Sequence, residues 1–520
     1  MQETDAGLEL LKDDVNEISS WVVKDIEKDI IIPELEHYFA TGGLLSHLEY
    51  KVIGDGFTHT RFDDTTIPNE QVGFYLLDPR KKYNSILQVR PIAFSYNVKE
   101  SRALLSLILG HVEKQLPRDG VTLKVQDPIT GDIRGVKLTG FKGSDVAFEN
   151  MMYSVDGTSA THGCSQCFGR FGPNAPDQNT EPVFDPASLR TLKKMRILGE
   201  INQHYYANMT GAELKAQKDV DRLPELFEAS GMEIPNWNRK PSTLCTEINI
   251  ACKNQRGPPL TLTEPENSVM ESCHWFLNIN RGWRCCYLQK LGEQVDQDIK
   301  LADEAYLGSK RPLKGWDATA SVKLLANPKH TSDLLSGHFL QKQVAVVNDS
   351  LAVLGAFMLK KELDDADVNA FERAAGLLGV TWYAFFSTKE RCEDACRELG
   401  LPVPPPEAAF LSFHPGSYEH HTIAHAVPFV RKHKSFIKYS SWGCEALNNV
   451  WKTLLLEYTT NSGGGKEFDP GYEAMLRMLR MTNPLFRKHS ERFAEERRRR
   501  VYKCGKCQMV VPALTGHVVG

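Results

Sequence analysis

The chain has 520 residues, of which 41% are hydrophobic and 25% are charged, and its formal net charge is −4. This globular composition allows two to four domains and a sizeable core, and the near-neutral charge gives no indication of a polyanionic partner. No apolar stretch approaches about 18 residues and the acidic N-terminus is unlike a signal peptide, so we expect neither a membrane span nor secretion.

Twelve cysteines in a chain without a secretory signal predict reduced thiols and metal ligands in a cytosolic or nuclear protein, not a disulfide framework. Two pairs have the C-x2-C spacing: Cys164 with Cys167, and Cys504 with Cys507. The other cysteines are scattered and are expected to be small buried apolar residues.

The predicted elements begin with a helical segment over residues 1–45, where apolar residues recur at spacings of three and four. The pattern then changes to β-strands separated by turn residues, with one helix over 97–116 after the third strand. The predicted strands cover residues 47–62, 70–79, 85–96, 121–127 and 134–145. This order predicts a compact mixed α/β unit.

From about residue 160 to 430 the chain is mostly helical, with Pro- and Gly-rich joints. A long helix over 440–458 follows, with Ser440 or Ser441 as its cap. A loop and a further helix over 472–486 lead to a strongly basic run at 487–503. Such a run is either a solvated helix end or a contact for nucleic acid.

Three acidic residues occupy settings that suit catalysis. Asp55 is flanked by glycines late in an apolar strand, Asp145 ends another strand, and Glu445 lies about one turn into the long helix. A lone aspartate beside glycine at a strand end is usually a turn former. In a ribonuclease-H-like fold, however, two neighbouring strands and one packed helix bring such groups together. Their oxygens can then hold two Mg²⁺ ions about 3.5–4 Å apart for phosphodiester chemistry.

A second pattern consists of soft ligands. Cys164 and Cys167 present two thiolates to one ion, and the missing two ligands can come from the other cysteine pair or from His420 and His425. A closed site of this kind is structural, whereas a fortuitous cysteine pair and surface histidines are the alternative. The segment HHTIAH, which includes His421, lacks the Glu of H-E-x-x-H, so a zinc-dependent hydrolase is disfavoured.

The order and spacing of these residues resemble the catalytic core of the V(D)J recombinase family. This family comprises the recombination-activating protein one, the Transib-type transposases and the RAG-like transposases of invertebrates. The cysteine pair begins 19 residues after the second aspartate (164 − 145), and the glutamate follows the second histidine by 20 (445 − 425). The sequence segments FKGSD, HHTIAH and GCEALNN are also similar to segments of the family. The third segment places Asn448 on the same helical face as Glu445. The resemblance covers most of residues 45–460.

The resemblance implies a nuclear DDE-type transposase or recombinase-like endonuclease. Asp55, Asp145 and Glu445 would be its catalytic residues and the ligands of two Mg²⁺ or Mn²⁺ ions. Such an enzyme nicks double-stranded DNA beside a terminal inverted repeat or recombination signal. The freed 3′-hydroxyl then forms a hairpin on the flanking DNA, and strand transfer follows. The family works as a homodimer, often with a kelch-type accessory partner. The alternative is a domesticated, catalytically inactive DNA-binding relative.

The resemblance also implies two zinc sites. The first would clamp the helical insertion onto the catalytic fold and set the direction of Glu445; its structural Zn²⁺ would be bound by Cys164, Cys167, His420 and His425. The second, a candidate only, is similar to the C-x2-C…G-H tail of RAG-like transposases and comprises Cys504, Cys507 and His517.

The expected fold class is therefore α/β: a ribonuclease-H-like mixed sheet interrupted by a large, mostly helical zinc-binding insertion. The expected parts are a truncated helical segment, the first part of the catalytic domain, the insertion, the C-terminal catalytic helices and a basic tail. They cover residues 1–45, 46–160, 161–430, 431–490 and 491–520.

Some features depart from the family pattern. The interval between the two aspartates (145 − 55 = 90) is shorter than in the recombinase, and Asp63 or Asp64 is an alternative to Asp55. Too few residues precede Asp55 for the terminal-repeat-binding and dimerisation helices, so we expect a fragment, a truncated form or a minimal member. Trp382 falls near a family tryptophan that steadies distorted DNA, although a core position is favoured.

Overall fold

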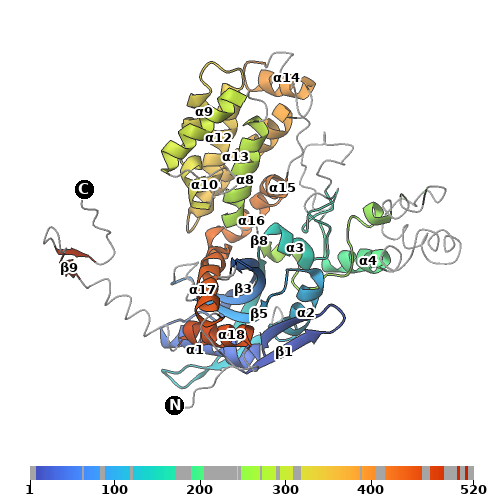
Figure 1. Ribbon diagram of the computed structural model, residues 1–520, viewed down its shortest axis with the longest axis vertical. Helices are drawn as coiled ribbons and strands as arrows, with labels where there is room; N and C mark the ends of the chain where they lie inside the picture. Colours follow the sequence, from blue (N-terminus) through green and yellow to red (C-terminus); the bar gives the residue numbers. More distant parts are fainter. Residues whose placement is uncertain are drawn as a thin grey trace.

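The computed structural model describes most of the chain between residues 7 and 484, and two short strands near the C-terminus (Figure 1). The described residues are 7–60, 64–81, 88–117, 121–157, 160, 162–169, 189–203, 240, 243, 248–269, 272–288, 293–308, 318–386, 389–403, 416–459, 469–484, 501–503 and 510–512. They form a mixed α/β structure with a curled mixed sheet.

The N-terminal segment is only partly helical, so the prediction for residues 1–45 is wrong over its first half. Leu8–Asp13 (β1) and Ile18–Val23 (β2) form an antiparallel hairpin. The Asp13 carboxylate closes its turn by accepting backbone hydrogen bonds from Val15 (3.1 Å) and Asn16 (3.2 Å). Because β2 pairs with a strand of the main sheet, tertiary pairing overrides the helical spacing of the apolar residues.

Helical structure begins after this hairpin. A π-helical turn over Glu27–Ile31 runs directly into α1 (Ile32–Ala40), which has Pro33 at its start, where a missing N–H costs nothing. Glu34 of α1 pairs with the buried Arg90 of the sheet at 3.2 Å, which fixes the helix against the strands.

The five strands predicted between residues 47 and 145 are confirmed, and they build the centre of one sheet. Three of them form an antiparallel meander, and the last pairs parallel with the first. The sheet order is β1-β2-β5-β4-β3-β7-β6, with β8 also parallel to the end of β7. The strands are β3 (His47–Thr60), β4 (Thr66–Leu77), β5 (Val89–Tyr96), β6 (Thr122–Gln126), β7 (Ile133–Gly143) and β8 (Ser268–Val269).

Helices cover both faces of this sheet. On one face, Trp451 stacks on Phe94 with ring centroids 4.2 Å apart. On the other face, Phe148 lies over Gly54, where a Cβ would be 1.8 Å from the phenyl ring, so only glycine fits. The first face carries α17 (Trp442–Thr459) and α18 (Pro470–Thr482), and the second carries α2 (Arg102–Val112) and α3 (Val146–Met152).

A second core is formed by helices that lie above the sheet in Figure 1. Trp275 and Trp283 are buried in it, and Trp382 is 1% exposed with its ring 5.0 Å from that of Trp283. Trp382 is therefore a core residue, as favoured. The helices are α8 (Ser272–Leu288), α9 (Glu293–Leu307), α10 (Ala318–Leu325), α11 (Lys329–Leu334), α12 (Gln341–Leu359), α13 (Asp365–Phe386), α14 (Lys389–Glu398), α15 (Ser417–Ala424) and α16 (Ala426–His433).

The helix α12 corrects the expectation that no apolar stretch approaches the length of a membrane span. It has 19 residues and is long and apolar enough by length and composition, but half of that window is buried inside the protein. The helix packs against α8 and α13, and its buried Asn348 accepts a hydrogen bond from Trp283 at 2.8 Å. These contacts make α12 the central helix of the second core.

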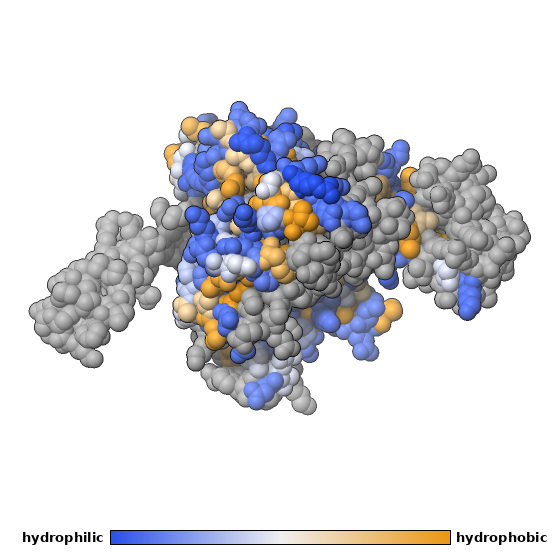
Figure 2. Space-filling model, turned by 90° about the horizontal axis from the view of Figure 1, so that it is seen from above, coloured by the Kyte–Doolittle hydropathy of each residue, from blue (hydrophilic) through white to orange (hydrophobic). Residues whose placement is uncertain are grey.

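The end of the molecule seen from above carries hydrophilic and apolar residues side by side (Figure 2). Exposed apolar side chains of α12 and α13 include Val353 and Val380. The remaining described elements are α4 (Leu192–Asn202), a 3-10 turn over Pro265–Asn267, another over Ile437–Tyr439, and the two-stranded pair β9 (Val501–Lys503) and β10 (Val510–Pro512).

Candidate functional site

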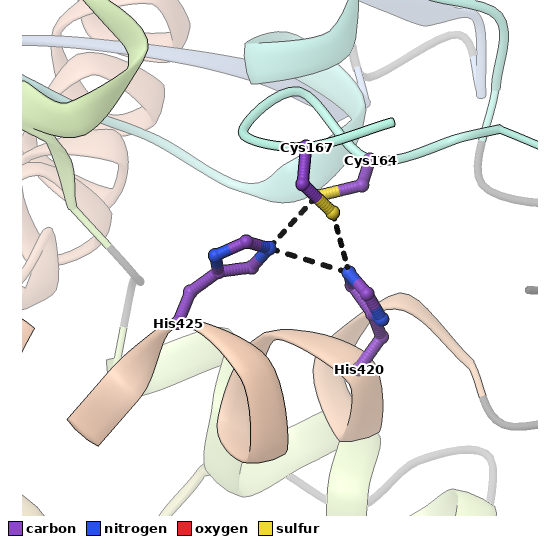
Figure 3. A group of neighbouring side chains, drawn as sticks. All are labelled: Cys164, Cys167, His420 and His425. Carbon is purple, nitrogen blue, oxygen red and sulfur yellow. Dashed lines mark hydrogen bonds between the residues drawn. The ribbon is translucent and has the colours of Figure 1, made fainter. Parts of the chain in front are cut away.

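Two cysteines and two histidines that are distant in the sequence meet in one buried cluster (Figure 3). Cys164 and Cys167 lie on the loop that follows α3, whereas His420 lies on α15 and His425 caps its C-terminal end. All four side chains are buried, and their ligand atoms lie within 4.8 Å of one another. The structure therefore brings the predicted cysteine pair together with His420 and His425 in a buried Cys2His2-type cluster that could hold a metal such as zinc.

The geometry of this cluster fits a tetrahedral metal ion such as Zn²⁺. With Zn–S near 2.3 Å and Zn–N near 2.0–2.1 Å, neighbouring ligand atoms in a tetrahedron lie about 3.3–3.8 Å apart. The observed separations are 3.3 Å from Cys164 Sγ to His425 Nε2 and 3.3 Å from Cys167 Sγ to His420 Nε2. The two histidine Nε2 atoms are also 3.3 Å apart. The chain supplies all four ligands, so such a site is closed and structural.

Backbone groups around the cysteines favour thiolates. The amides of Gln166 and Gly169 each donate to a sulfur at 3.3 Å, one to Cys164 and one to Cys167. The buried Arg190 donates from Nε to the Cys167 carbonyl at 3.0 Å, which holds a positive charge beside the pair. Burial lowers the pKa of Arg190 to about 10, and the cysteines act in the opposite direction.

The third histidine of the cluster, His421, approaches Cys164 with its Nε2 at 3.5 Å from the sulfur. It is completely buried, and burial lowers the pKa of both His421 and His425, with neighbouring histidines adding to the effect. Neutral imidazole is the form that binds a metal, so the site favours ligation over protonation.

The two predicted catalytic aspartates lie near the same end of two adjacent parallel strands, Asp55 within β3 and Asp145 two residues after the end of β7. In the register of β3 and β7, Ile53 is opposite Gly143. Asp55 and Asp145 each follow this pair by two residues, and neighbouring strands are about 4.8 Å apart, so the two aspartates belong to the same edge of the sheet. Asp145 also caps α3 by accepting a hydrogen bond from the Phe148 amide at 2.7 Å.

The helix α17 is fixed against Asp55 through Asn448. The Asn448 side-chain amide donates to Asp55 Oδ2 at 2.5 Å and its oxygen accepts from Gln71, which is opposite Asp55 in β4. Gln71 also reaches the Cys444 carbonyl at 3.4 Å and accepts from Trp451 at 2.6 Å. These contacts hold the first turns of α17 against Asp55 on β3 and Gln71 on β4.

Glu445 lies in the first turn of α17, directly after Cys444 and three residues before Asn448. Residues three positions apart share a helical face. Because Asn448 contacts Asp55, the backbone of Glu445 lies on the side of α17 that faces Asp55. The Glu445 side chain lies outside the part that the structure describes. The alternatives to Asp55 have no comparable position: Asp64 is exposed in a turn, and Asp63 lies outside the described residues.

Two carboxylates that the sequence analysis missed lie beside the aspartates. Glu70 on β4 is completely buried, and Glu100 precedes α2. Burial raises the pKa of Glu100 to about 7, and the charge of Asp145 adds to the rise. Burial also raises the pKa of Glu70 well above its usual value. The charges of Glu100, Asp55 and Asp145 raise it further, while the Asp55 backbone amide opposes the rise.

Only weak signals in the sequence point to these two residues. Glu70 is the first residue of the strand predicted over 70–79, although β4 begins four residues earlier, and Glu100 stands just before a helix that follows a buried strand. Neither setting has a distinctive spacing, so pattern reasoning passes over both.

The acidic cluster of Asp55, Glu70, Glu100 and Asp145 fits hard divalent cations. Carboxylate oxygens are the ligands that Mg²⁺ and Mn²⁺ prefer. Both Glu70 oxygens are buried without a hydrogen-bond partner of normal geometry among the described residues. Gly56 has no side chain, and a Cβ there would lie 3.0 Å from Glu70 Oε2 and 3.4 Å from Glu100 Oε2. The carboxylates of Glu70 and Glu100 therefore converge at the position that Gly56 leaves without a side chain.

The second candidate zinc site cannot be placed, because Cys504, Cys507 and His517 lie outside the described residues. No family model and no curated protein sequence matches the chain.

Proposed function

We propose that the protein is a DDE-type endonuclease of the transposase and recombinase class, which nicks DNA with two Mg²⁺ or Mn²⁺ ions. The observation that carries this proposal is that Asp55 in β3 and Asp145 just after β7 each follow the paired residues Ile53 and Gly143 by two positions, with α17 held against Asp55 by Asn448. Two neighbouring strands and one packed helix are what a ribonuclease-H-like site requires. We therefore also infer a ribonuclease-H-like fold, with the helical part as its zinc-binding insertion.

In this function, Asp55, Asp145 and Glu445 hold the ions, and no residue of the chain becomes covalently attached to DNA. The bound ions activate a water or 3′-hydroxyl and stabilise the leaving oxygen of the phosphodiester. Asn448 fixes one oxygen of Asp55, so that the other is presented to an ion in a constant direction. The start of α3 holds Asp145 in the same way through the Phe148 amide.

The Cys-His cluster supports this site from a distance along the chain. Its second histidine, His425, precedes Glu445 by 20 residues, and the intervening segment includes α16 and a short 3-10 turn. The Ser440 carbonyl at the end of that segment accepts a hydrogen bond from the buried Lys51 of β3. A metal in the cluster would thus anchor the start of the segment that leads into α17. Lys51 anchors the end of that segment.

The test is nicking of supercoiled plasmid DNA by the full chain with Mg²⁺ or Mn²⁺. We expect Glu445→Ala and Asp145→Asn to reduce the rate to about one thousandth or less, a loss of about 4 kcal/mol of barrier stabilisation. DNA binding and zinc content should be retained. Glu473→Gln, an acidic residue of α18 that pairs with Arg477 at 3.9 Å, is the matched control and should cut normally.

The rival is a domesticated relative that binds DNA without cutting it. If the wild-type chain and the Glu445→Ala variant bind DNA alike and neither nicks it, this rival is correct. Loss of activity on zinc removal alone, with no dependence on Asp145, would instead indicate a zinc-dependent hydrolase. Action at terminal inverted repeats or recombination signals, a homodimer, a kelch-type accessory partner and a nuclear location belong to the same proposal.

A further inference from the structure

The middle strand of the meander contains a buried carboxyl group that the proposed catalytic triad does not use. Glu70 of β4 is completely buried, and both of its side-chain oxygens lack a hydrogen-bond partner of normal geometry among the residues that the structure describes. Burying a carboxylate in this way is strongly unfavourable unless it is neutralised or paired. Such a group in a native protein indicates a partner that the chain itself does not supply.

The backbone register shows where that partner would bind. Glu70 is opposite Gly56 in the pairing of β4 with β3, so both lie on the same face of the sheet. This is the face of Gly54 and α3, opposite to that of Asp55 and Gln71. A Cβ on Gly56 would lie 3.0 Å from Glu70 Oε2 and 3.4 Å from Glu100 Oε2. One oxygen of each carboxylate therefore lies close to the same point beside Gly56, where a side chain would be crowded.

The charges around Glu70 identify the kind of partner. The groups that act most strongly on it are the carboxylates of Glu100, Asp55 and Asp145. No lysine, arginine or histidine is among these groups. Carboxylate oxygens are hard ligands, and they attract a hard cation.

We propose that Glu70 is an additional ligand of the acidic site, and that it holds a divalent cation such as Mg²⁺ or Mn²⁺ together with Glu100, whose carboxylate converges with that of Glu70 beside Gly56. This inference rests on the acidic cluster of the proposed function and deepens it. The bound cation would lie on the α3 face of the sheet, whereas Asn448 of α17 reaches Asp55 from the other face. Glu70 would then add a ligand from β4, the strand between β3 and β5.

The experiment measures Mn²⁺ binding to the full, zinc-loaded chain by electron paramagnetic resonance and calorimetry. Glu70→Gln keeps the size of the side chain and removes its charge. We expect the affinity for one Mn²⁺ ion to fall about 10- to 100-fold, the range for changes that disturb metal ligation. The melting temperature without divalent ions should rise, because the buried charge is gone, and its further increase on adding Mg²⁺ should shrink.

A second variant keeps the test informative if Glu70→Gln fails to fold. Gly56→Ala leaves every carboxylate in place but fills the space between Glu70 and Glu100, and it should weaken the same Mn²⁺ ion. Glu419→Gln is the control, since Glu419 is a buried carboxylate with its pKa raised to about 7 by burial and lies outside the acidic cluster. It should leave the Mn²⁺ affinity unchanged.

The outcomes separate this inference from the proposed function. Unchanged Mn²⁺ affinity and stoichiometry in both Glu70→Gln and Gly56→Ala would overturn the role of Glu70, even if Asp145→Asn still abolished nicking. Weakened binding in both variants would support that role, even if the wild-type chain failed to nick DNA. A wild-type chain that binds no Mn²⁺ would overturn both.

Discussion

The Cys-His cluster and the acidic cluster are each assembled from segments that are far apart in the sequence, but they balance their charges differently. In the first, the chain provides two sulfurs, two imidazoles, amide donors to both sulfurs and a buried arginine beside them. In the second, carboxylates surround other carboxylates, and the oxygens of Glu70 have no partner of normal geometry within the described residues.

This difference matches two kinds of metal site. A closed set of four ligands leaves no position for water or substrate, so a metal bound there would only hold the fold together. The acidic cluster, in the function proposed above, would instead bind hard cations that keep coordination positions for other oxygens. The following predictions test the contrast.

The largest effect on stability should follow removal of zinc from the Cys-His cluster. Structural zinc contributes about 10–16 kcal/mol in small zinc-dependent domains, so we expect Cys164→Ala or zinc chelation to lower the free energy of unfolding by several kcal/mol. The measurements are zinc content by mass spectrometry and thermal unfolding. Cys252→Ala, which removes a buried cysteine outside the cluster, should keep its zinc. An unchanged melting temperature without zinc would show that the Cys-His cluster is not structural.

A smaller effect is expected from Asn448→Ala. Without its amide, Asp55 loses the contact that fixes it to α17, and the nicking rate should fall about 10- to 100-fold with little change in melting temperature. Asn449→Ala changes the exposed neighbour and serves as the control. Equal rates for the two variants would mean that Asn448 does not position Asp55.

The smallest effect concerns pH. Because the pKa of Glu100 is raised to about 7 in the fold, the folded chain binds more protons than the unfolded chain between about pH 4.5 and pH 7. Stability in Mg²⁺-free buffer should therefore fall as pH rises through this window, by about 1–2 kcal/mol after allowance for the partial exposure of Glu100. Urea unfolding at several pH values measures the slope.

Added Mg²⁺ should remove this pH slope, and Glu100→Gln should remove it without Mg²⁺. The exposed Glu390→Gln on α14 is the control and should retain the slope. A slope that persists in Glu100→Gln would assign the proton uptake to another group of the acidic cluster.

Local patterns in the sequence predicted several features well. Alternation of apolar residues predicted β3, β4 and β5, because a strand that is buried in a sheet must present apolar side chains at regular intervals. The spacing of Cys164 and Cys167 predicted a metal ligand pair, since two thiolates with two residues between them can reach one ion. These features depend on neighbours in the chain.

Other features depended on partners far away in the chain. The hairpin of β1 and β2 was predicted as helix, because the apolar spacing is compatible with both structures and only pairing with β5 selects the strand. The helix α12 has the length and composition of a membrane span, and only its packing against α8 and α13 identifies it as a core helix.

By itself, the sequence determined the chemistry available: soft ligands at Cys164, Cys167, His420 and His425, and hard ligands at Asp55 and Asp145. The tertiary structure decided which of these groups meet and what surrounds them, including the entry of Glu70 and Glu100 into the acidic cluster. The physical reason is that ligand type is a property of a single side chain. Strand register, helix docking and the charge balance of a buried cluster are instead properties of segments brought together only by folding.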